Sequence, residues 1–221
     1  MVRLCEDVDI LKYEPALFGE LHPANQVLAT GQNGELAGTT FTAEGADFGL
    51  AGVEPGGVIY LCSADSSLDG AYEVAAVDSA EQLCVSILRG DRQDDPIAPP
   101  AGPQATGIFY RVSTLKPQIE EVSLRLTGYF GIGAGDTDSE YSAEDILDLE
   151  EIRQVCSAGV IATAYAMLAA NQGDELLWNK QQHYEQLFNK DKERCRVALD
   201  KNGDGVADSV RFGGCGRLIR E

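Results

Sequence analysis

The chain has 221 residues, of which 44% are hydrophobic, so it can bury the core of one large domain or two small ones. It carries 17 basic and 36 acidic side chains, which gives a net charge of −19. A charge of this sign repels nucleic-acid phosphates and argues against sequence-reading or scaffold-type nucleic-acid binding. An acidic wall beside DNA, in contrast, would be a surface to which DNA does not stick.

The six cysteines are spread widely, with no Cys-x-x-Cys pair and no histidine cluster near them, so a zinc site is not expected. Four of them lie in apolar patterns, where a free thiol behaves as a small hydrophobe, as suits a reducing cytosol. The N-terminal residues lack an apolar segment of signal-peptide length. The longest near-apolar run, residues 158–170, is too short to span a bilayer, so no membrane role is indicated.

Residues 1–25 predict a helical lead-in that Pro15 interrupts. From residue 26 to 113, short β-type runs alternate with Gly, Pro and Asp. The predicted strands are residues 39–42, 58–62, 72–77, 83–88 and 109–112. Their spacing of roughly ten residues predicts a small antiparallel barrel or sandwich. The dipeptide Asp69-Gly70 is interpreted as a turn with positive φ, and residues 91–107 as a long exposed loop.

Residues 114–208 have helical periodicity. A first helix begins near Pro117, and its buried face is predicted at Ile119, Val122, Leu126 and Phe130. Ser142 is a plausible N-cap for a second helix. Asn171 to Gly173 should end that helix, and Asp174 should cap a third, so that the two form a helical hairpin. Trp178 is expected to pack where the pair closes.

Catalysis finds little support in the sequence. Only His22 and His183 could titrate near neutrality, and neither lies in a pattern typical of a nucleophile system. The chain has no Gly-x-Ser-x-Gly, no phosphate-cradling loop and no His-Glu-x-x-His motif. No catalytic residue and no cofactor are therefore predicted.

The most specific spacing lies in the acidic loop, residues 200–208. Asp200, Asn202, Asp204 and Asp208 stand at positions 1, 3, 5 and 9 of an EF-hand-like pattern, with Gly205 at position 6. Position 12 is Arg211, where a bidentate Glu is required, and no second apolar helix follows. The pattern favours a capped turn over a calcium site, and calcium is expected to be dispensable.

The long helix, the break, the aromatic-bearing helix with Trp178 and Tyr184, and the loop with its basic, glycine-broken tail follow one another in an order that resembles a known family. These features, over residues 116–221, resemble the head-to-tail adaptor (connector, head-completion) proteins of tailed bacteriophages. The β-module looks like the small β-domains of phage structural proteins, which the minimal all-helical adaptor lacks. The expected fold is thus α+β: an antiparallel helical bundle with an inserted barrel or sandwich and an extended C-terminal tail.

The resemblance implies a virion structural protein of the neck, made in the host cytoplasm. It implies a ring of about twelve copies under the portal protein, which contacts a tail-side neck or tail protein and lets genomic DNA pass without sequence-specific binding. Residues 26–113 would be the inserted module, 114–208 the adaptor bundle and 209–221 a portal-binding tail. The expected partner-binding residues are Arg211, Phe212, Arg217, Leu218, Ile219 and Arg220.

Other classes of function remain as alternatives. A calcium-binding module would use residues 200–208, and another phage neck or tail protein would share the same composition. A barrel that binds nucleic acid should have a basic face, whereas residues 1–115 carry 5 basic and 17 acidic side chains, a net charge of −12. A tail with glycines at residues 213, 214 and 216 should be disordered alone and fold on binding.

Overall fold

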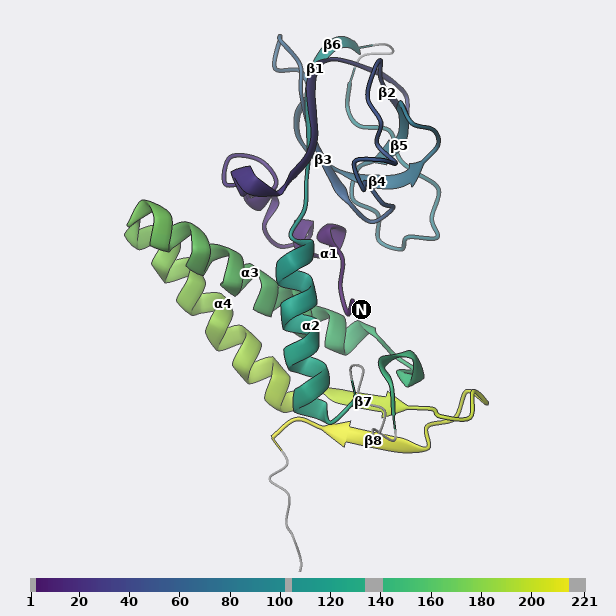
Figure 1. The fold of residues 1–221 in the computed structure, drawn as a ribbon, viewed down its shortest axis with the longest axis vertical. Helices are drawn as coiled ribbons and strands as arrows, with labels where there is room; N and C mark the ends of the chain where they lie inside the picture. Colours follow the sequence, from purple (N-terminus) through teal and green to yellow (C-terminus); the bar gives the residue numbers. More distant parts are fainter. Residues whose placement is uncertain (1–2, 102–104, 134–140, 215–221) are drawn as a thin grey trace, which may run out of the picture. The chain divides into compact units, whose positions relative to one another are not determined.

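The computed structural model describes residues 3–101, 105–133 and 141–214. The chain divides into two compact units, coloured by sequence in Figure 1. The helical unit consists of Met1–Asp9 and Lys116–Glu221, and the barrel unit is Ile10–Leu115. The barrel unit is therefore an insertion into the sequence of the helical unit.

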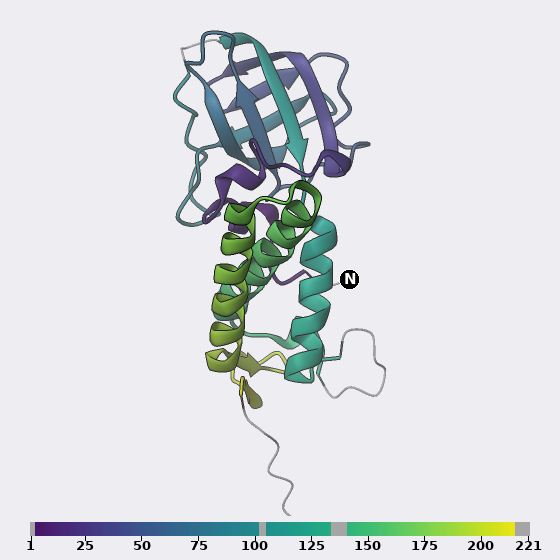
Figure 2. The ribbon, with the colours of Figure 1, turned by 90° about the vertical axis from the view of Figure 1, so that its left-hand side faces the viewer.

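The barrel unit is built from six antiparallel strands in the closed order β1-β2-β5-β4-β3-β6 (Figure 2). The strands are β1 (Val27–Ala37), β2 (Thr40–Ala43), β3 (Val58–Cys62), β4 (Asp69–Val77), β5 (Gln82–Ser86) and β6 (Ala105–Ser113). Strand β1 closes the barrel because it pairs with β2 on one side and β6 on the other. The mixed α+β class is confirmed, and of the two predicted β architectures the protein has the barrel.

Strand β1 is absent from the sequence prediction, because its glycines and polar residues hide the β pattern. These glycines are needed for packing. A Cβ on Gly34 would lie 2.6 Å from the Phe41 ring, and a Cβ on Gly31 would lie 2.6 Å from the Tyr110 ring. The two rings meet edge-on inside the barrel, with centroids 5.3 Å apart. The register of β1 against β6 shifts at these glycines, as in a β-bulge.

The barrel unit begins earlier than the predicted module of residues 26–113. Leu17 and Phe18 are buried, and Nη2 of Arg111 on β6 donates hydrogen bonds to the carbonyl oxygens of Phe18 and Gly19 at 3.2 and 2.6 Å. The short helices of this lead-in are α1 (Asp7–Leu11), η1 (Pro15–Leu17) and η2 (Ala24–Gln26). The Arg111 hydrogen bonds thus tie the segment after Asp9 to the barrel.

The turn before β4 differs from the prediction. Asp69 and Gly70 are strand residues of β4, paired with Cys62 and Leu61. The positive φ of 57° is instead at Ser66, in a turn that side-chain hydrogen bonds hold together. The Ser63 hydroxyl accepts from the Leu68 N–H at 2.9 Å. Short polar side chains therefore stabilise this turn, for which the sequence predicts a glycine with positive φ at Gly70.

The helical unit contains three long helices, α2 (Lys116–Phe130), α3 (Glu150–Gln172) and α4 (Glu175–Arg194), and the short η3 (Ala143–Asp145). The predicted apolar face of α2 is confirmed as buried. Helix α3 ends at Gly173, whose φ is 67°, and the Asp174 side chain accepts the Leu176 N–H at 2.8 Å. Helices α3 and α4 lie side by side as the expected hairpin (Figures 1 and 2).

Two predictions about these helices are wrong. Ser142 caps η3 through a reciprocal capping box with Asp145, and α3 begins only at Glu150. Trp178 is 43% exposed, and the neighbouring Leu176 is 63% exposed, so the tryptophan does not close the α3–α4 pair. The fully buried Tyr165 of α3 lies there instead: it stacks on Tyr184 and accepts a hydrogen bond from the Lys180 ammonium at 3.0 Å.

A hairpin that the sequence analysis did not predict follows α4. It consists of β7 (Arg196–Leu199) and β8 (Ser209–Phe212), paired antiparallel. The region expected to be an extended tail from residue 209 therefore starts with a strand. The helices of this unit are accompanied by a small sheet that the predicted helical bundle did not include.

We expect Gly34→Ala to destabilise the barrel unit by about 1–3 kcal/mol, because the added methyl group overlaps the Phe41 ring and forces it from its place. Urea unfolding followed by tyrosine fluorescence measures this change. The matched control is Gly90→Ala, where an added Cβ meets nothing within 4 Å. Equal stability of the two variants would contradict this account of β1.

Candidate functional site

The acidic loop, residues 200–208, connects β7 to β8. Asp200 organises it: one carboxylate oxygen accepts the Gly203 N–H and the other the Gly205 N–H, both at 2.7 Å. The two glycines have φ values of 74° and 81°, which explains why glycine stands at these positions. Burial of Asp200 raises its pKa, but the backbone hydrogen bonds to the carboxylate outweigh burial and hold the pKa below its ordinary value.

The other oxygen donors of the loop also serve its own backbone. Asn202 accepts the Asp204 N–H at 2.9 Å, and Asp204 accepts the Val206 N–H at 2.8 Å. Asp208 accepts the Lys201 N–H at 2.9 Å. Within the described residues, no group of three or more His, Cys, Asp or Glu side chains is placed to hold a metal ion. Each of the four candidate calcium ligands accepts a backbone hydrogen bond within the loop, and together they build the capped turn that the sequence pattern favours.

The hairpin has a buried face and an exposed face. Val197 and Leu199 of β7 are fully buried, whereas Val210 and Phe212 of β8 are 36% and 50% exposed. The Arg196 guanidinium lies over the Phe212 ring, 5.3 Å from its centroid. Apolar side chains beside a cation, on a strand open to solvent, are suited to contact with another protein.

The two edges of the hairpin also differ. Strand β7 pairs with β8 on one side, and on its other side Ile146 forms a bridge with Leu199. Among the described strands, β8 pairs only with β7, so its outer edge has no strand beside it. Such an edge can accept an added strand from a partner.

The chain leaves β8 along a fixed path. The Gly213 N–H donates to the Cys195 carbonyl at 3.0 Å, and the Gly214 N–H donates to the Tyr129 hydroxyl oxygen at 2.9 Å. A Cβ on Gly213 would lie 1.9 Å from the Lys192 carbonyl oxygen, so only glycine fits there. The ends of α2 and α4 thus hold the point from which the C-terminal residues depart.

The predicted partner-binding residues fall into two groups. Arg211 and Phe212 lie in β8, with the Arg211 guanidinium 5.6 Å from the centre of the Tyr141 ring. Arg217, Leu218, Ile219 and Arg220 lie outside the described residues. The sequence does not predict the apolar face that Val210 and Phe212 form on β8. Its only signal is the alternation of these two apolar residues with Ser209 and Arg211 over a four-residue strand.

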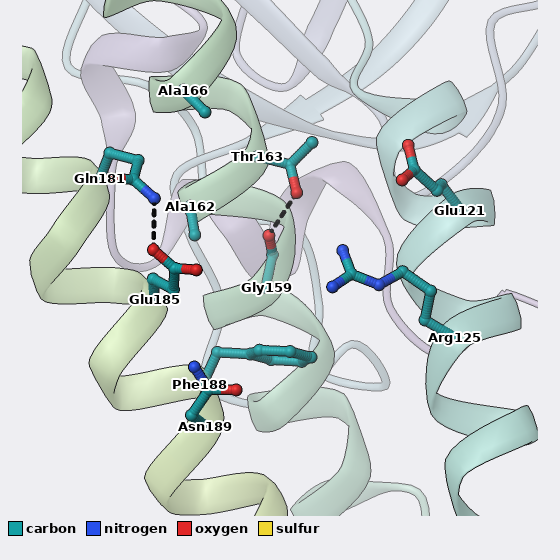
Figure 3. A pocket seen from close by; sticks show the side chains of 10 residues that line it. All are labelled: Glu121, Arg125, Gly159, Ala162, Thr163, Ala166, Gln181, Glu185, Phe188 and Asn189. Atoms are coloured by element: carbon teal, nitrogen blue, oxygen red, sulfur yellow. Dashed lines mark hydrogen bonds between the residues drawn. The ribbon is translucent and has the colours of Figure 1, made fainter.

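A second candidate surface is a groove of about 220 Å³ among α2, α3 and α4 (Figure 3). Gly159, Ala162 and Ala166 of α3 line it, and Phe188 reaches across from α4. The Arg125 guanidinium of α2 lies 6.0 Å from the Phe188 ring centroid. Its other lining residues are polar or charged: Glu121, Thr163, Gln181, Glu185 and Asn189. A small apolar floor with charged walls can receive an apolar side chain from a partner.

The histidines have ordinary surroundings. His22 Nδ1 lies 3.0 Å from the Gly19 carbonyl oxygen, and burial lowers the pKa of His22 while this hydrogen bond opposes the change. His183 is exposed on α4, with its ring edge-on to Tyr184. We assign neither of them a catalytic role.

One helix among the described residues, Glu150–Asn171, is long and apolar enough to cross a membrane by length and composition. Of its most apolar window, 72% is buried inside the protein. Burial of this extent is also what a core helix shows.

We expect the acidic loop to be stable without calcium. Addition of calcium or of a chelator should leave the thermal midpoint unchanged, because the loop oxygens already accept backbone hydrogen bonds. Asp200→Ala should lower the midpoint by several degrees in both conditions, since Gly203 and Gly205 lose their acceptor. The control Asp204→Asn keeps an acceptor for Val206. Tight stoichiometric calcium binding in calorimetry, lost in Asp204→Asn, would overturn this prediction.

We expect Gly213→Ala to lower the free energy of unfolding of the helical unit by about 1–3 kcal/mol, because the new methyl group collides with the Lys192 carbonyl. Urea unfolding followed by the helical circular dichroism signal measures this. Gly128→Ala on α2, where an added Cβ meets nothing within 4 Å, is the control and should be neutral or stabilising. An unchanged midpoint for Gly213→Ala would show that the chain does not pass against α4 here.

Comparisons with protein-family models, with curated proteins and with solved structures give no match.

Proposed function

We propose that the protein is a head-to-tail adaptor of a tailed bacteriophage: a virion structural protein that forms a ring of about twelve copies under the portal and continues the DNA channel. In this role it contacts the portal protein on one side and a neck or tail protein on the other. It is not an enzyme, and it works in the neck of the virion after assembly in the host cytoplasm. The helical unit is the part that we assign to the ring.

The observation that carries the proposal is strand β8 and the path that follows it. This strand has an exposed apolar face with Val210 and Phe212, and an outer edge with no strand beside it among the described residues. Gly213 and Gly214 then hold the exit of the chain between the ends of α2 and α4. The residues beyond include Arg217, Leu218, Ile219 and Arg220, a basic and apolar set suited to an acidic, strand-bearing partner.

The charge of the chain supports a role beside DNA without binding to it. The barrel unit, residues 10–115, carries 4 basic and 14 acidic side chains, a net charge of −10. Residues 116–221 carry 12 basic and 19 acidic side chains, a net charge of −7. Negative walls repel the phosphate backbone, so DNA can slide past without being held.

A ring needs two different surfaces on each copy, because a head-to-tail interface joins unlike patches. The helical unit offers such surfaces. One is the groove of α2, α3 and α4 with its small apolar floor (Figure 3). Another is the first turn of α4, where Leu176 and Trp178 are 63% and 43% exposed. Exposed tryptophan is a common anchor at protein interfaces, which supports contact between copies.

The test is truncation after Gly214, which removes residues 215–221 and leaves β8 with its described contacts in place. We expect the truncated protein to keep its helical circular dichroism signal and to lose attachment to portal particles by at least about tenfold, because every copy in the ring loses one contact. Co-sedimentation with purified portal particles measures attachment. The control Glu144→Ala changes an exposed side chain of η3 and should attach normally. Unchanged attachment of the truncated protein would refute the portal-binding role of these residues.

A further inference from the structure

Two cysteine thiols that are distant in sequence meet inside the helical unit. The Sγ atoms of Cys5 and Cys156 lie 3.1 Å apart, although the residues are 151 positions apart in the chain. Both side chains are buried, with exposures of 2% and 0%. A disulfide requires its sulfurs about 2.05 Å apart, so a shift of roughly 1 Å separates this contact from a covalent bond.

The surroundings hold Cys5 against α3. The Leu4 N–H donates to the Ser123 hydroxyl oxygen at 3.0 Å, and that oxygen lies 3.7 Å from the Cys156 sulfur. On the other side of Cys5, the Arg153 guanidinium of α3 lies 3.7 Å from the Asp9 carboxylate. Contacts on both flanks therefore fix the N-terminal segment and bring the two thiols together.

We propose that Cys5 and Cys156 are an oxidation site, which forms an intramolecular disulfide when the protein moves from a reducing cytosol to an oxidising medium. The oxidant is a low-molecular-weight disulfide such as oxidised glutathione. One cysteine thiolate attacks it to form a mixed disulfide and releases one small thiol. The second thiolate attacks the mixed disulfide and releases the other small thiol. The two cysteines lose two protons and two electrons, and the small disulfide becomes two thiols.

Burial of both thiols makes this reaction slow in the folded protein. The hydrogen bond with Cys156 and burial raise the pKa of the Cys5 thiol, so little thiolate is present near neutrality. Cys5 lies in a short segment before α1, whereas Cys156 lies within the long helix α3, and a short segment opens locally more easily than a long packed helix. Cys5 is therefore the thiol that reacts first, and closure of the segment brings it back to Cys156.

The bond has a specific structural consequence. Cys5 precedes the barrel unit and Cys156 follows it, so the disulfide closes a covalent loop that contains all of Ile10–Leu115. The two sequence-separated parts of the helical unit become joined. Because long loops lose the most entropy in the unfolded chain, we expect the thermal midpoint of the oxidised protein to rise by roughly 10 °C. This inference is independent of the phage role.

The experiment uses the full chain, reduced and then incubated with oxidised glutathione. Remaining thiols are alkylated with N-ethylmaleimide in denaturant, and the intact mass and the peptide map are recorded. We expect the loss of two labelled thiols, a linked peptide pair that joins Cys5 to Cys156, and a raised midpoint that dithiothreitol reverses. The control Cys62→Ser should still form the bond between Cys5 and Cys156. Cys62 belongs to the barrel unit, where its sulfur lies 3.7 Å from the Ser63 carbonyl oxygen.

Cys5→Ser and Cys156→Ser should each abolish the linked peptide. The peptide map of the unaltered chain decides the question even if one of these variants does not fold. A fully labelled chain after oxidation, a glutathione adduct on Cys5 without a cross-link, or a link between other cysteines would overturn the proposal.

Discussion

The close approach of three helices at Gly159 determines the geometry of the helical unit. A Cβ on this residue of α3 would lie 2.8 Å from the Phe188 ring of α4 and 2.9 Å from a methyl group of Val122 on α2. The missing side chain lets both neighbouring helices pack directly on the α3 backbone. The position of α4 in turn fixes where β7 begins, and the ends of α2 and α4 fix where Gly213 and Gly214 lie.

This arrangement leaves specific surfaces open. Helix α4 buries only Leu177 and Phe188 among its side chains, so most of its length faces outward. The groove of Figure 3 lies among α2, α3 and α4, with Phe188 across it. The hairpin turns Val197 and Leu199 inward and exposes Val210 and Phe212. An inward-facing core and several unlike outer surfaces are what a subunit of a ring needs, and this is the physical basis of the proposed function.

The sequence predicts the parts of the fold in which the pattern and the packing agree. The buried run of β3 and the apolar stripe of α2 are examples. Gly173 and Asp174 are two more, because the left-handed glycine ends α3 and the Asp174 side chain caps the start of α4. Strand β1 is not predicted from the sequence because Gly31 and Gly34 leave room for the aromatic rings of Tyr110 and Phe41 on other strands. This requirement arises from tertiary packing, so no local sequence pattern shows it. The prediction that Trp178 packs between α3 and α4 is wrong, because this large aromatic side chain is partly exposed on the helix surface.

In the candidate site, the sequence predicts the capped turn of the acidic loop but not the strands on either side of it. The acidic loop was recognised as a capped turn from its Asp, Asn and Gly spacing, yet the four-residue strands on either side were not seen, because Arg196 and Arg211 interrupt their apolar pattern. The groove could not be predicted, since its residues come from three helices and meet only in the folded chain.

We propose that this chain closes a ring on the portal. Electron cryomicroscopy of purified portal particles mixed with the protein tests it most directly. The account predicts a closed ring of about twelve copies around the DNA channel, with strand β8 and the residues after it against the portal. A reconstruction that places the chain in the capsid lattice or in the tail tube, or that leaves the portal bare, would contradict it.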